Sequence, residues 1–254
     1  MTSPVPESAA VATTAGLWAD SFTQFSMFHA VCVAICATSV VLVCLFAKRL
    51  QRGPVANREP RFASALGGSM GVVAIAYTAY FLAPERFSWQ TSLPLQFCDL
   101  LVIAAPLALL TSVRWLRTLV VFWGIGLSTQ AFVSPIVHVG YSHTYFWLFW
   151  GSHLAIVMAA SYHLVVYRYR ARAADLLTVT LSMCFYAAVM IPLNIVLDAN
   201  YGFAGRSKPG AASIIDALGP WPLRLVWMFL IQQVLMVVLW FLLRERRHAA
   251  AASA

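Results

Sequence analysis

Residues 27–47 read MFHAVCVAICATSVVLVCLFA, a run of twenty-one positions without Asp, Glu, Lys or Arg. A helix needs about 20 mostly apolar residues to cross a bilayer, so this stretch predicts a membrane-spanning helix. Further stretches of the same character follow at 62–82, 93–112, 116–135, 144–166, 175–197 and 220–243. The sequence therefore predicts an all-α membrane protein, a bundle of seven transmembrane helices.

The composition agrees with this architecture. Hydrophobic residues make up 61% of the chain and charged residues only 10%, against about 25% charged in an ordinary soluble domain. These values exclude a soluble globular protein and a disordered chain. The net charge is +8, but the basic residues lie in short clusters between apolar runs. We interpret them as topology signals that face anionic lipid, and we expect no nucleic-acid partner.

The basic residues also predict the orientation. Thirteen of the 17 Lys and Arg residues follow the first, third, fifth and seventh apolar segments, and four lie on the opposite side. The positive-inside rule then puts the amino terminus outside and the carboxyl terminus inside. We expect a polar extracytoplasmic tail at 1–26, one transmembrane domain at 27–243 and a basic cytoplasmic tail at 244–254. The lysines, Lys48 and Lys208, lie in connections, which excludes a retinal Schiff base within a span.

Polar residues gather in the predicted outer half of the bundle. Asp99 lies roughly 8–9 Å from the outer end of its span and His153 roughly 13 Å from the end of its own. The other members of this outer layer are Cys98, Gln130, Asn194, Arg224, Gln232 and Gln233. The inner half has no comparable set. An unpaired carboxylate at this depth is costly, so we expect Asp99 to have a partner within the bundle, and Arg224 is one candidate.

Cys98 and His153 lie at overlapping depths and could form a thiol–imidazole pair. A thiolate is a nucleophile, and a nearby histidine can accept its proton. The alternative is that Cys98 packs as a small apolar residue and that His153 makes an interhelical hydrogen bond. The five cysteines form no C-x-x-C pair and stand without the ligands of a metal site. We therefore expect no metal and no cofactor.

The connection at 198–219 is the longest one on the predicted outer side. It begins with Asn200-Tyr201-Gly202-Phe203 and ends with a capping-box pattern and Gly219-Pro220. We interpret this connection as a structured cover over the outer end of the bundle, although it could also be a simple connector.

Several motifs resemble those of a known family. Leu93-Pro94-Leu95-Gln96-Phe97-Cys98 is similar to the L-P-L-x-x-C motif of bacterial YwaF-like integral membrane proteins. The other similar elements, in chain order, are Phe122-Trp123-Gly124, Gln130, Ser134-Pro135, His153, Asn194, Asn200-Tyr201, Lys208-Pro209, Ser213, Asp216 and Gly219-Pro220-Trp221-Pro222. The resemblance runs from roughly the second to the seventh predicted span.

This resemblance implies a location and a chemistry. The family is grouped with a eukaryotic membrane acyltransferase that remodels ether phospholipids through a cysteine acyl-thioester. The resemblance implies a bacterial plasma membrane, Cys98 as the nucleophile and His153 as the general base. The resemblance and the depth argument together point to supporting residues: Asp99, Gln96, Gln130, Asn194, Asn200, Tyr201, Lys208 and Arg224. Many bacterial members have His at the position of Gln96, and glutamine cannot relay a proton as histidine can.

The sequence thus leaves two hypotheses. The first is acyl transfer to or from a membrane lipid, or lipid-ester hydrolysis, in an outer-leaflet cavity. Asn194 or Gln130 would then hydrogen-bond the developing oxyanion. The second is a non-catalytic binder, carrier or receptor for a lipid or a small polar solute, in which the same polar layer holds the ligand. The sequence shows no inverted repeat, which argues against a transporter.

Overall fold

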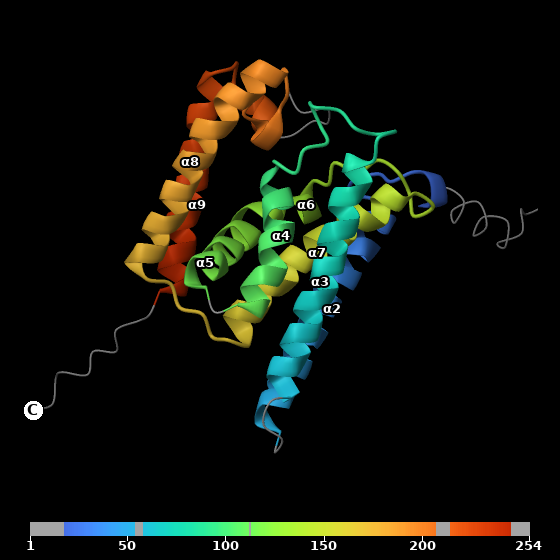
Figure 1. Ribbon diagram of the computed structural model, residues 1–254, viewed down its shortest axis with the longest axis vertical. Helices are drawn as coiled ribbons and strands as arrows, with labels where there is room; N and C mark the ends of the chain where they lie inside the picture. The colour runs from blue at the N-terminus through green and yellow to red at the C-terminus, as the bar shows by residue number, and fades with distance from the viewer. Residues whose placement is uncertain (1–17, 54–57, 112, 207–213, 245–254) are drawn as a thin grey trace, which may run out of the picture.

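The structure is a computed structural model that describes residues 18–53, 58–111, 113–206 and 214–244 (Figure 1). These residues form an all-helical fold. The helices are α2 (Met27–Arg52), α3 (Arg58–Leu82), α4 (Phe97–Leu110), α5 (Arg114–Trp123), α6 (Gln130–Val133), α7 (Thr144–Val165), α8 (Ala173–Leu197) and α9 (Leu223–Leu243). One π-helical turn, Gly124–Ser128, joins α5 to α6, and 3-10 turns occupy Tyr201–Phe203 and Ile214–Leu218.

Six of the seven predicted spans are confirmed within the described ranges as helices long and apolar enough to cross a membrane. They are α2, α3, the continuous stretch Arg114–Val133, α7, α8 and α9. The third predicted span instead contains the shorter apolar helix α4. Which end of the bundle faces outward stays a prediction.

Helix α4 begins later than the sequence suggests. It has 14 residues, which at about 1.5 Å per residue give a length of about 21 Å, whereas the hydrocarbon core is about 30 Å thick. Leu93 directly precedes Pro94, and the residue before a proline disfavours the helical conformation. The apolar run is therefore extended at its start. The backbone N–H of Leu93 donates to the Tyr201 hydroxyl instead of to a helical carbonyl.

The helices are arranged with α4 at the centre. Figure 1 shows α8 and α9 side by side at one edge of the bundle and α2 and α3 at the other, with α4, α5 and α7 between them. Helix α4 packs on α3, α5 and α7. Gly67 allows α3 to approach α4 closely, because a Cβ at this position would lie 2.9 Å from Leu110 Cγ. Helix α4 is therefore enclosed by other helices.

Burial separates the centre of the bundle from its edges. Side chains with no exposed surface lie where the central helices meet, among them Val102, Ala105, Val120, Ile156 and Ala159. The edge helices instead expose large apolar side chains, such as Leu42 of α2, Phe185 of α8 and Phe241 of α9. An apolar exterior around a packed interior is what a lipid environment requires. The protein is thus a multi-pass membrane protein.

Candidate functional site

Asp99 organises the first turn of α4. Its carboxylate Oδ2 accepts a hydrogen bond from the Gln96 backbone N–H at 2.9 Å, and the Cys98 thiol donates to Oδ1 at 3.8 Å. A negative side chain is stabilising at a helix N-terminus because the free N–H groups there carry partial positive charge. Asp99 is only 5% exposed. The expectation that Asp99 has partners within the bundle is confirmed.

Two tyrosines from neighbouring helices complete this group. Tyr77 of α3 and Tyr145 of α7 both lie close enough to Cys98 and Asp99 to interact with them electrostatically. We call Tyr77, Gln96, Cys98, Asp99 and Tyr145 the Cys98 cluster. It brings one thiol and one carboxylate together where three helices meet.

A segment distant in sequence lies on the start of α4. This cover segment, residues 199–206, contacts the extended stretch before α4 through its backbone. The Gly202 backbone N–H donates to Gln96 Oε1 at 2.7 Å. Gly202 has φ +63°, and a Cβ there would lie 2.4 Å from the Tyr186 hydroxyl oxygen. Only glycine fits both the conformation and the space.

Tyr186 and Tyr201 tie the extended stretch to the cover segment. The Tyr186 hydroxyl of α8 donates to the Leu95 carbonyl at 2.6 Å. The Tyr201 hydroxyl donates to the Trp89 carbonyl at 2.9 Å and accepts from the Leu93 N–H at 3.0 Å. Burial raises the pKa of the Tyr201 phenol, so this hydroxyl stays protonated as a donor. Irregular backbone at the edge of a membrane is satisfied here by side chains.

Three further predicted site residues hold the cover segment. Asn194 Nδ2 donates to the Tyr201 carbonyl at 2.8 Å, and Asn194 Oδ1 accepts from the Tyr201 N–H at 2.7 Å. Asn200 Oδ1 accepts from the Gly205 N–H at 2.9 Å, and the guanidinium of Arg224, 2% exposed, donates to the Gly205 carbonyl. Residues 199–206 are structured and lie on the start of α4, as expected of a cover, and that this end faces outward stays a prediction. Lys208 lies outside the described residues.

Two expectations need correction. Asp99 and Arg224 do not form an ion pair. Among the described residues, the ion pair joins Arg114 and Asp175. Arg224 instead donates to the Gly205 carbonyl of the cover segment. Gln130 is exposed, whereas Asp99 is buried, and no hydrogen bond joins the two residues within the described ranges. The expectation that Gln130 faces the site is not supported by this position.

His153 lies on α7, the helix that also carries Tyr145. Its Nδ1 lies 2.7 Å from the Phe149 carbonyl oxygen. A carbonyl can only accept, so Nδ1 carries the proton of the neutral imidazole and Nε2 is the basic nitrogen. The Phe149 ring lies 4.5 Å from the imidazole. In the described part of the chain no hydrogen bond joins His153 to Cys98, although α4 and α7 pack together.

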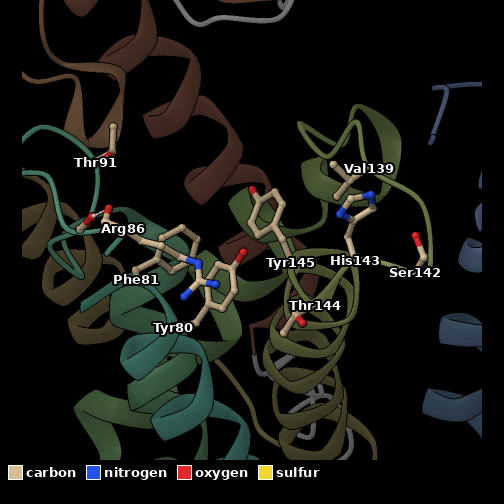
Figure 2. Close-up of a pocket in the computed structure, with 10 residues that line it drawn as sticks. Tyr80, Phe81, Arg86, Thr91, Val139, Ser142, His143, Thr144 and Tyr145 are labelled. Atoms are coloured by element: carbon tan, nitrogen blue, oxygen red, sulfur yellow. Dashed lines mark hydrogen bonds between the residues drawn. The ribbon is translucent and has the colours of Figure 1, made fainter. Parts of the chain in front are cut away.

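A pocket opens beside the Cys98 cluster, with a cavity volume of about 560 Å³. Figure 2 shows Tyr80, Phe81 and Arg86 on one side of it and His143 and Tyr145 on the other. The Arg86 guanidinium lies 4.6 Å from the centre of the Tyr80 ring. Tyr145 belongs to both the pocket wall and the Cys98 cluster. Aromatic rings, the hydroxyls of Ser and Thr side chains and the two basic groups of Arg86 and His143 line the pocket, and none of the described lining residues is a carboxylate.

The opposite end of the bundle contains polar groups that the sequence analysis missed. Asp175 accepts from Arg114 Nη2 at 2.5 Å and from the Thr118 hydroxyl at 3.0 Å, and Thr118 also contacts the Tyr169 hydroxyl at 3.0 Å. We call these four residues the Asp175 cluster. The expectation that the inner half has no comparable polar set is wrong, because residues near the ends of predicted spans turn inward and pair.

The residues that carry the geometry were only partly predictable. Gln96, Cys98 and Asp99 are adjacent in sequence, so their proximity follows from the chain itself. Tyr77 and Tyr145 belong to no sequence motif, and a tyrosine in an apolar stretch is usually interpreted as a residue at the membrane–water interface. In the sequence, the pocket residue Arg86 is only one of the charged residues in the connections between spans.

The family model of the TMEM164 family matches residues 24–244. The chain belongs to the TMEM164 family. The match covers every membrane-spanning helix and the whole Cys98 cluster, so this TMEM164 family member shares the family's transmembrane character over its full helical domain. No curated protein and no solved structure matches the chain.

Proposed function

We propose that this protein is an integral membrane acyltransferase or lipid-ester hydrolase that works through an acyl-thioester on Cys98. The observation that carries the proposal is the position of the Cys98 thiol, bonded to a buried carboxylate and separated by Tyr145 from an open pocket. A nucleophile beside a pocket, with an acceptor for its proton, is the arrangement that covalent catalysis needs.

His153 is the general base in this proposal. Its protonation on Nδ1 leaves Nε2 free to take a proton. Tyr145, Phe149 and His153 follow one another at four-residue spacing along α7. The imidazole therefore lies two helical turns beyond the Tyr145 ring. Catalytic hydrogen bonds in substrate-free enzymes are often long and tighten only when substrate binds.

The chemistry has two halves. Cys98 Sγ attacks the acyl carbonyl carbon, the ester C–O bond breaks, and the thiol proton passes through His153 Nε2 to the leaving oxygen. An acceptor hydroxyl or water then attacks the thioester, gives its proton to His153, and the thiol is restored. Asn194 is bonded to the Tyr201 backbone, so we propose the Tyr77 hydroxyl as the donor to the oxyanion; this hydroxyl interacts with Asp99 in the substrate-free protein and turns to the oxyanion when substrate binds.

The proposal includes the finer family relation. We propose that the chain is a YwaF-like protein of a bacterial plasma membrane, with the predicted outward orientation of the Cys98 cluster. Gln96 then has a structural role, because its amide oxygen accepts a hydrogen bond from the Gly202 N–H. In this chain the residue holds the cover segment and needs no proton-relay capacity.

Intact-mass measurement of the purified protein, incubated with a phospholipid, tests the proposal. The control is Cys184→Ala, because Cys184 is an exposed thiol on α8. We expect one acyl adduct on wild type and on the control, none on Cys98→Ala, and accumulation slowed by about 10²-fold or more in His153→Ala. An adduct that survives in Cys98→Ala contradicts the proposal.

A non-catalytic binder is the second candidate. The volume of the pocket supports it, since small-molecule sites usually enclose about 300–1,000 Å³. Saturable lipid binding by both wild type and Cys98→Ala, without any acyl adduct on wild type, favours this function over catalysis.

A further inference from the structure

A second hollow lies between α2 and α3, at the end of the bundle opposite the Cys98 cluster. Its lining residues are Phe46, Arg49, Leu50, Gly53 and Arg58, and its volume is about 430 Å³. The two helices pack along each other, and Figure 1 shows their connected ends extending beyond the nearby end of α4. The hollow thus combines side chains from two helices.

The hollow lies at the boundary of the apolar part of the helices. The uncharged run of α2 ends at Ala47, and α3 begins with Arg58. Phe46 is half exposed, and its ring packs against Phe62 at 5.1 Å. Phe46 thus forms the part of the hollow nearer the bilayer centre, and Arg49, Leu50 and Arg58 lie toward head-group depth.

The charge around the hollow is strongly positive. Residues 48–61 contain five basic side chains and one acidic side chain, Glu59. Glu59 is buried and accepts a hydrogen bond from the Tyr162 hydroxyl at 2.5 Å. Neither Arg49 nor Arg58 forms an ion pair or a side-chain hydrogen bond within the described ranges. The two guanidinium groups are left for an anion from outside the chain.

We propose that this hollow binds the head group of an anionic phospholipid. The phosphate lies between Arg49 and Arg58, and the glycerol and the first part of an acyl chain lie on Phe46 and Leu50. Planar guanidinium groups recognise phosphate oxygens in pairs. Basic pockets between transmembrane helices are established places for anionic head groups. This lipid is a resident ligand, distinct from any substrate at Cys98.

Native mass spectrometry of the delipidated full-length protein tests the site. The probes are phosphatidylglycerol, phosphatidylcholine with the same acyl chains, and inorganic phosphate. The test variant is Arg49→Gln/Arg58→Gln. The matched control is Arg52→Gln/Arg61→Gln, which removes the same charge from exposed arginines of the same two helices that do not line the hollow.

We expect wild type and the control to bind phosphatidylglycerol, and the test variant to lose affinity by about 30-fold, the loss that two arginine–phosphate contacts imply. Inorganic phosphate should not compete at millimolar concentration. Equal losses in the test variant and the control overturn the proposal, because net charge alone would then explain binding. Equal binding of phosphatidylcholine, or full competition by inorganic phosphate, also overturns it.

Photo-crosslinking in intact membranes provides a readout that needs no variant. A photoactivatable phosphatidylglycerol should label peptides that contain residues 46–58 of the wild-type chain. Labelling that spares this segment and falls elsewhere on the helices contradicts the site. Neither experiment depends on acyl transfer, so the two proposals can fail separately.

Discussion

Asp99 and Asp175, two buried carboxylates at opposite ends of the bundle, are held in different ways. Asp175 accepts from both the Nε and Nη2 atoms of Arg114, at 3.0 and 2.5 Å, from Thr118, and from the Arg172 backbone N–H at 2.8 Å. Asp99 accepts from the Gln96 backbone N–H and the Cys98 thiol and also interacts with the Tyr77 hydroxyl, and no Arg or Lys in the described ranges bonds to it. Asp175 is thus paired with a charged guanidinium, whereas the partners of Asp99 are neutral donors.

This difference indicates that the Asp175 cluster has a structural role, whereas Asp99 and the Cys98 cluster remain available for chemistry. The Arg114–Asp175 pair fixes the start of α8 to the start of α5 and leaves no lone pair for other chemistry. At the opposite end, the cover segment is joined to α4 by amide and phenol groups. Neutral hydrogen bonds contribute less than charged ones. We therefore expect changes in the Asp175 cluster to alter stability alone, and changes around the cover segment to alter access to Cys98.

Asp175→Ala should have the largest effect on stability. The substitution removes the carboxylate that pairs with Arg114 and leaves the Arg172 N–H without its acceptor, while Thr118 keeps only its contact with Tyr169, so the free energy of unfolding should fall by about 2–3 kcal/mol. Thermal unfolding in detergent measures this change, with Glu85→Ala as an exposed control. The rate of maleimide labelling of Cys98, with the other cysteines replaced by alanine, should stay unchanged. Faster labelling in folded protein contradicts the separation of the two ends.

Gly202→Ala should have the next largest effect and should act on the other end. The positive φ and the close approach to Tyr186 both penalise a side chain, and the loss of stability should be about 1–3 kcal/mol. The cover segment should shift, and maleimide labelling of Cys98 should become faster. Gly68→Ala is the control, because a Cβ at Gly68 meets nothing within 4 Å. Slow labelling in Gly202→Ala would show that residues 199–206 do not cover Cys98.

Tyr201→Phe should cost more than Tyr186→Phe. The first change leaves the buried N–H of Leu93 unpaired, whereas the second leaves only the Leu95 carbonyl without a donor. Unpaired N–H groups are tolerated less well than unpaired carbonyls. We expect losses of about 1–2 kcal/mol for Tyr201→Phe and about 0.5–1 kcal/mol for Tyr186→Phe, measured by thermal unfolding. The reverse order contradicts this interpretation of the extended stretch.

Gln96→His should have the smallest effect. An imidazole nitrogen can accept from the Gly202 N–H as the Gln96 amide oxygen does, so stability and Cys98 labelling should remain near wild type. Gln96→Ala removes the acceptor and should lower the free energy of unfolding by about 1 kcal/mol. If Gln96→Ala behaves like wild type, residue 96 does not hold the cover segment.

Much of the fold was predictable because membrane spans are encoded locally. Six predicted spans matched helices, since apolar length alone determines them. The start of α4 was missed because it depends on Pro94 and on the hydroxyls of Tyr186 and Tyr201, which lie 91 and 108 residues from their backbone partners. A sequence pattern does not contain such distant partners.

The candidate site likewise has a part that the sequence predicts and a part that only the fold reveals. The closeness of Gln96, Cys98 and Asp99 follows from one helical turn. The roles of Asn194, Asn200 and Arg224 as supports of the cover segment require the fold. The Asp175 cluster was missed because Arg114 and Asp175 stand at the ends of predicted spans, where charged residues are counted as topology signals. Depth estimates along single helices cannot show which end residues pair.

The short length of α4 has a consequence for how the chain enters the membrane. A helix of 14 residues that contains Asp99 and Pro106 is a poor insertion signal by itself, because insertion machinery tests each segment for sufficient apolar length. Its extended approach is satisfied only by tyrosines that are synthesised about a hundred residues later. We expect α4 to integrate together with α3 or α5 and to reach its final depth only after α8 and the cover segment have emerged from the ribosome.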